Sequence, residues 1–271
     1  MSEKLADFFR LLADRDQEPE PLSADLSEFL EKQPGQPIPL PWAITLVSSL
    51  SGVGRSEQRR RSEALQALVP EFPPIAEALV EALDSTDFDL RWGAAYTLGK
   101  LSPENPIIWP AICEMLAAED GDSRWAAAEI TCSMARLSPS LLAELREATR
   151  GDSGTLRRMA LYCLRDLQAE GLFEIARERL DDPDAHVRLS ALSTLTKTDI
   201  PTEQRADLTA RLIEILTADP AAGAQRSAAA TIGKLQLLEA RPELEKAAIS
   251  ADGGIARAAR QALDRWSEKP F

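Results

Sequence analysis

Apolar residues recur along this chain with the spacing of amphipathic helices, and the pattern itself returns in units of about thirty residues. Each unit holds an apolar-periodic stretch, a short turn-forming cluster and a second helical stretch. Ile75 to Leu83 is one such first stretch, and it precedes a second stretch around Arg91. No segment alternates convincingly between apolar and polar residues, as strands do. The pattern therefore predicts an all-α protein built from helical pairs.

The second helix of each unit carries a short block that marks the repeat. The block has alanine at its fourth position in every copy and opens with arginine in all copies but the last. The blocks begin at Arg61, Arg91, Arg124, Arg157, Arg188, Arg226 and Ala256. A small residue at a fixed position lets neighbouring helices approach closely. The repetition predicts a solenoid, in which each unit buries its apolar face by stacking on its neighbours.

An acidic residue lies four positions before the block in five copies: Glu57, Asp87, Asp120, Asp184 and Asp252. A carboxylate at the start of a helix accepts hydrogen bonds from unpaired N–H groups and favours the positive end of the helix dipole. From that place it can also reach the arginine one turn further on. We therefore expect it to cap the helix, with an ion pair to the arginine as a second role.

One copy spells Asp-x-x-Val-Arg-x-x-Ala at Asp184, Val187, Arg188 and Ala191. These paired helices resemble HEAT repeats, and the short units resemble the bacterial HEAT-like variety, from about Leu40 to Trp266. The resemblance implies a right-handed α-solenoid of about six to seven helical pairs. It says little about activity, since repeat solenoids serve many roles.

Residues 1–39 differ from the repeats. Pro-rich connections at 14–21 and 33–41 flank a short amphipathic stretch, Ser23 to Lys32. We expect this segment to be a helical cap or a mobile arm, and residues 40–271 to form the solenoid.

Helix-wheel positions one, five and eight residues after the block's first residue point away from the first helix of the pair. The HEAT resemblance implies that this side lines a concave surface. In three consecutive units it carries residue types enriched in binding hot spots, with one glutamate and small residues beside them. The candidate partner-binding residues are Trp92, Tyr96, Trp125, Glu129, Arg158, Tyr162 and Arg165. The alternative is that the large rings fill gaps between neighbouring helices.

Charge and cysteine usage narrow the classes of function. The net charge of −13 argues against nucleic-acid binding and against adsorption to anionic membranes. The basic island Arg55 to Arg61 is best explained as a solvated face. The three cysteines lack metal-ligand spacing, and there is no apolar signal segment, so we expect a cytoplasmic protein without disulfides.

No catalytic signature is found in the sequence, and neither a metal nor a cofactor is expected. The leading hypothesis is a non-catalytic scaffold or adaptor that holds another protein or peptide on its concave face. Short HEAT-like units also resemble those of phycobilin lyases, which implies a chromophore-binding enzyme as one alternative. A HEAT-like DNA glycosylase is a second alternative, and the acidic charge disfavours it.

Overall fold

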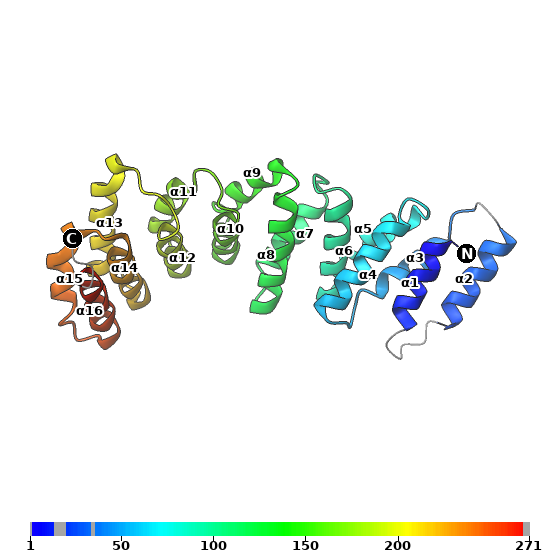
Figure 1. Ribbon diagram of the computed structural model, residues 1–271, viewed down its shortest axis with the longest axis horizontal. Coiled ribbons are helices and arrows are strands. Elements are labelled where there is room, and N and C mark those ends of the chain that lie inside the picture. The colour runs from blue at the N-terminus through cyan, green and yellow to red at the C-terminus, as the bar shows by residue number, and fades with distance from the viewer. Residues whose placement is uncertain (1, 14–19, 34–35, 268–271) are drawn as a thin grey trace. The chain divides into compact units, whose positions relative to one another are not determined.

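The computed structural model describes residues 2–13, 20–33 and 36–267, and within these ranges the chain is all-α (Figure 1). Sixteen α-helices and three short 3-10 helices follow one another, and none of the described residues forms a strand. The helices make about eight consecutive pairs. The count predicted from residue 40 onward is lower because it leaves out the first two helices.

The chain divides into two compact units, one ending at Leu141 and the other beginning at Leu142. The helices of the first unit are α1 Glu3–Ala13, α2 Glu20–Lys32, α3 Leu40–Ser48, α4 Arg55–Leu68, α5 Pro74–Ala82, α6 Phe88–Leu101, α7 Ile108–Leu116 and α8 Gly121–Ala135. Helix α9, Pro139–Ala148, spans the boundary. Those of the second unit are α10 Gly154–Asp166, α11 Leu172–Glu178, α12 Ala185–Leu195, α13 Arg205–Ala218, α14 Ala222–Leu235, α15 Arg241–Ala247 and α16 Gly253–Ser267.

The even-numbered helices from α4 onward carry the repeated block, and within each unit they pack on one another in succession. In the first unit α4 contacts α6, and α6 contacts α8; in the second unit α10, α12, α14 and α16 follow the same order. The block alanines lie at these contacts, and all but Ala64 are fully buried, as expected: Ala94, Ala127, Ala160, Ala191, Ala229 and Ala259. The small repeated residue therefore sets the close spacing of these helices, as the sequence predicts.

The last block begins with Ala256 where the other six begin with arginine. Ala256 is 3% exposed in α16. Helices α14 and α16 approach closely at Gly233, where an added Cβ would stand 2.7 Å from Ala262 Cα. Leu101, the last residue of α6, is 39% exposed.

Helix α1 packs on α4 through its apolar face. Leu5, Phe8, Phe9 and Leu12 are buried there, and Lys4 Nζ donates to the Ala67 carbonyl at 3.3 Å. This contact favours the cap over the arm for residues 3–13. Residues 14–19 and 34–35 of the Pro-rich connections lie outside the described residues. The domain boundary at residue 39 stays a prediction.

Candidate functional site

Most of the repeated acidic residues cap the block-bearing helices. Asp184 Oδ1 accepts from the His186 N–H at 2.7 Å, and Asp120 Oδ2 accepts from the Ser123 N–H at 2.7 Å. Asp87 and Asp252 accept in the same way at the starts of α6 and α16. Glu57 does not. It lies inside the first turn of α4 and is 3% exposed.

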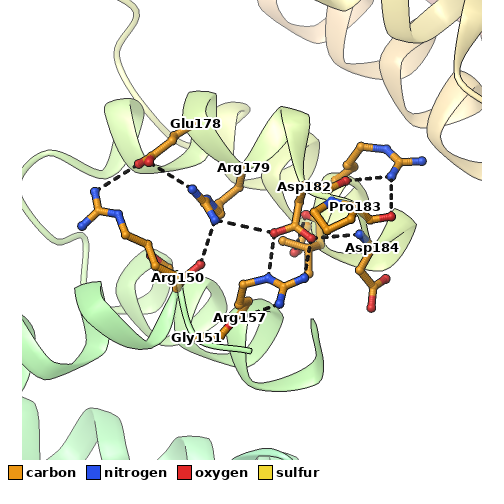
Figure 2. Close-up of polar contacts among 12 residues, drawn as sticks. Arg150, Gly151, Arg157, Glu178, Arg179, Asp182, Pro183 and Asp184 are labelled. Carbon is orange, nitrogen blue, oxygen red and sulfur yellow. Dashed lines mark hydrogen bonds and ion pairs between the residues drawn. The ribbon is translucent and has the colours of Figure 1, made fainter. Parts of the chain in front are cut away.

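Two repeated arginines of the second unit bond to the next repeat instead: Arg188 pairs with Asp219 and not with Asp184, and Arg157 has Ser153 in place of an acidic residue one turn before it. Arg157 forms two parallel bonds with Asp182, Nε to Oδ2 at 2.8 Å and Nη2 to Oδ1 at 2.7 Å. Its Nη1 donates to the carbonyls of Gly151 and Asp152 at 2.9 Å each. Figure 2 shows Arg157 held between its own turn and the carboxylate of the next repeat. The expected pairing within one helix is found for Arg61 and Glu57, at 3.0 Å.

A cavity of about 760 Å³ in the second unit lies beside this network. Its walls carry Arg177, Arg179 and Arg211, and each of these guanidinium groups is paired with a carboxylate of the chain. Arg179 also donates to the Thr149 carbonyl at 3.2 Å. Because each wall arginine already has a carboxylate partner within the chain, we assign the cavity a structural part in joining the repeats.

Trp92, the first of the predicted partner-binding residues, is fully buried, so its expected exposure is wrong. Its indole N–H donates to the Ala126 carbonyl of α8 at 2.9 Å. Its ring stacks on Tyr96 with centroids 5.2 Å apart and planes 9° apart, and the Arg55 guanidinium lies 4.8 Å from its centroid. The helix wheel considers only the first helix of the pair, whereas α8 lies close enough to cover this ring. Trp92 therefore packs under the Tyr96 ring as a buried residue and does not face solvent.

Three other predicted residues of the first unit reach the surface. Trp125 of α8 is 50% exposed, Tyr96 of α6 is half-buried, and Glu129 is exposed one turn after Trp125. Burial raises the pKa of the Tyr96 phenol; Glu63 and Glu129 add to this effect, and Arg59 opposes it. These charges therefore lie within electrostatic reach of the ring. We call the side chains Arg59, Tyr96, Trp125 and Glu129, which are exposed or half-buried on α4, α6 and α8, the first-unit face.

Sequence reasoning missed Arg55 and Arg59 as members of this region. Arg59 Nη2 of α4 pairs with Glu129 Oε1 of α8, and Arg55 pairs with Asp89 at 2.9 Å. The solvated-face interpretation of the basic island fails for Arg61, which is 2% exposed. The missed signal is present in the sequence: Arg55 and Arg59 stand six and two positions before Arg61, which places both on the outward side of α4.

In the second unit the structure brings the remaining predicted residues together on α10. Arg158 and Tyr162 are half-buried, and the Arg165 guanidinium lies 4.7 Å from the centroid of the Tyr162 ring. Arg165 also pairs with Asp166 at 2.9 Å. This second-unit cluster, Arg158, Tyr162 and Arg165, thus shares with the first-unit face the stacking of a chain cation on an aromatic ring.

The described residues also bear on metal binding and on membrane crossing. No group of three or more His, Cys, Asp or Glu side chains within them is placed to hold a metal ion. None of the helices in the part that the structure describes is long and apolar enough to cross a membrane.

Comparison with known proteins supports the fold. No protein-family model matches the chain, and no curated protein matches it in sequence. Among solved structures, the chain is similar to Kap121p bound to RanGTP, with a TM-score of 0.59 and 12% identity over 97% of this chain and 32% of that one. The chain thus spans about a third of Kap121p.

Two further structures resemble it less closely. Escherichia coli YibA gives a TM-score of 0.47 at 18% identity over 99% of this chain and 93% of that one. The CpcE–CpcF complex of phycocyanin lyase from Nostoc gives 0.36 at 20% identity, over 85% and 89%. The structural neighbours are HEAT/armadillo-repeat proteins, and the fold defined here is an α-helical repeat of that class.

Proposed function

We propose that this protein is a non-catalytic scaffold or adaptor that binds another protein or peptide through the first-unit face. HEAT/armadillo-like folds typically bind proteins or peptides. The second-unit cluster is proposed as an additional contact region. No contact among the described residues favours the chromophore-binding or glycosylase alternative.

The observation that carries the proposal is the exposure of Trp125. Corresponding positions on later block-bearing helices hold Leu189 and Ser227, so stacking of the repeats does not require a large ring there. Tryptophan is the residue type that contributes most often to binding hot spots, where a partner removes it from water. Trp125 is the neighbour of Ala126, whose carbonyl accepts the Trp92 indole N–H, so its backbone is fixed by a buried contact.

The charge of the face indicates the kind of partner. Glu129 is exposed, Glu63 acts on Tyr96 from nearby, and the whole chain carries a net charge of −13. Complementary potentials steer encounter and discriminate against wrong partners. We therefore propose a partner segment whose surface is basic or mixed in charge and which contributes an apolar side chain to Trp125.

A peptide-display selection tests this proposal. A library of random twelve-residue peptides is selected in parallel on the wild-type protein, on Trp125→Ala and on Leu137→Ala, a control that truncates another exposed apolar side chain of the first unit. We expect one peptide family to be enriched on the wild type and the control and to be lost on Trp125→Ala. Equal enrichment on all three proteins, or none on the wild type, contradicts the proposal.

A further inference from the structure

The ion pair between Arg59 and Glu129 crosses the first-unit face. Arg59 belongs to α4 and Glu129 to α8, and α6 lies between these helices because it contacts both. The pair therefore passes over the helix that carries Tyr96. Seventy residues of sequence separate its two ends. A contact of this kind covers part of the face that a partner would use.

The pair is exposed and incompletely bonded. Its side chains are 39% and 50% exposed. Within the described part of the chain, no acceptor bonds to Arg59 Nε, which is itself buried. Exposed ion pairs contribute little to stability, because water screens them and two long side chains must be ordered. Opening this contact therefore costs little.

Cationic side chains of the same region lie against its aromatic rings. The Arg55 guanidinium lies over Trp92 at 4.8 Å, and Lys100 Nζ lies 5.7 Å from the centroid of the Tyr96 ring. Arg59 adds a guanidinium that meets the carboxylate of Glu129. Ring faces and carboxylates are the two groups that a guanidinium prefers. The chain's own arginine thus occupies a place suited to an arginine of another chain.

From this arrangement, and resting on the proposed function, we infer that Arg59 is an internal competitor at the first-unit face. A partner segment docks by presenting its own arginine, which takes the place of Arg59 at Glu129. The contact between α4 and α8 is then an autoinhibitory strap that opens on binding. An ion pair with a purely structural role would behave differently. Removing Arg59 or Glu129 would then lower the stability of the protein and would not tighten binding.

The probe is the peptide acetyl-Ser-Leu-Arg-Leu-Ser-amide, with a second peptide carrying norleucine in place of arginine. Binding is followed by NMR through the indole N–H signal of Trp125 in the full-length protein, assigned with Trp125→Phe. Arg59→Met keeps the aliphatic stem and removes the competitor. Since the apparent dissociation constant falls when a competing closed state is removed, we expect binding about two- to fivefold tighter than wild type.

Matched variants separate the strap from a general charge effect. Arg60→Met removes the same charge from the neighbouring position, where Arg60 pairs with Glu57. We expect it to bind the arginine peptide as the wild type does. Glu129→Gln is expected to lose binding in both the wild-type and the Arg59→Met background, whereas Asp122→Asn, an exposed carboxylate of the same helix, keeps it. The norleucine peptide is expected not to bind.

Equal tightening by Arg59→Met and Arg60→Met overturns the inference, as does binding that survives Glu129→Gln. These failures are distinct from failure of the proposed function. If the display selection yields Trp125-dependent peptides that carry lysine but no arginine, the scaffold proposal stands and the strap is refuted. If it yields no Trp125-dependent peptide, the proposal itself fails.

Discussion

Arg188 and Asp219 are joined by two parallel hydrogen bonds, Nε to Oδ2 and Nη2 to Oδ1, each 2.7 Å long. Both side chains are nearly buried, and Arg188 Nη1 also donates to the carbonyls of Asp182 and Pro183. Arg157 and Asp182 repeat the arrangement one repeat earlier. In the second unit, the arginine of the block therefore ties its own turn to the acidic residue that precedes the next block-bearing helix.

Replacing Asp219 with asparagine should therefore destabilise the protein. The substitution leaves the Arg188 charge buried without its counter-charge, which typically costs about 3 kcal/mol or more. The free energy of unfolding in urea measures the effect. Asp207→Asn is the control, because Asp207 is 83% exposed and lies 3.7 Å from Arg177, so a change below about 0.5 kcal/mol is expected there. Equal effects of the two substitutions would refute the structural role of the buried pair.

The stability of the protein should fall in acid through the same group. Burial acts to raise the pKa of Asp219, but the bonds from Arg188 and from the Ala221 N–H outweigh it and hold the pKa below its usual value. A lowered folded-state pKa stabilises the protein above the unfolded value of about 3.9, and this stabilisation is lost as pH falls below it. The difference in unfolding free energy between wild type and Asp219→Asn should thus shrink below pH about 4. A difference that stays constant from neutral pH into this range would contradict the prediction.

The block alanines should tolerate no larger side chain. Ala94 and Ala191 are fully buried, so Ala94→Leu or Ala191→Leu should overpack the helix contacts and cost about 1–3 kcal/mol. Ala230→Leu, on the exposed side of α14, should change the unfolding free energy by less than about 0.5 kcal/mol. Thermal or urea melts compare the three variants. Unchanged melts for both buried substitutions would show that the alanine does not set the helix spacing.

Each acidic cap should contribute to the free energy of unfolding. Asp184→Ala removes the acceptor for the His186 N–H at the start of α12 and should cost about 1 kcal/mol. Burial acts to raise the pKa of Asp184, while the bonds from His186 and the nearby Arg157 charge lower it overall. Asp184→Asn, which preserves a capping oxygen, serves as the comparison. Similar losses in both variants would assign the effect to charge instead of capping.

The sequence was sufficient for the helical-pair fold and the caps, because both depend on residues a few positions apart. Asp184 and Ala191 show this, since the acidic cap recurs at the starts of four block-bearing helices and the alanine recurs in every block. It was insufficient for contacts between repeats. Trp92 is covered by α8, Arg188 bonds to a residue 31 positions away, and Arg59 reaches Glu129 across α6. A helix wheel describes one helix and its first neighbour, so the partners contributed by the next repeat stay invisible to it.

The most direct test of the proposed function is the dissociation constant of the peptide selected on the wild-type protein, measured by calorimetry against Trp125→Ala and Leu137→Ala. Truncating a central binding residue typically costs about 2 kcal/mol, which corresponds to about thirtyfold weaker binding. We expect that loss for Trp125→Ala, with the helical circular-dichroism signal unchanged, and wild-type affinity for Leu137→Ala. Wild-type affinity in Trp125→Ala would contradict the assignment of the first-unit face as the binding site.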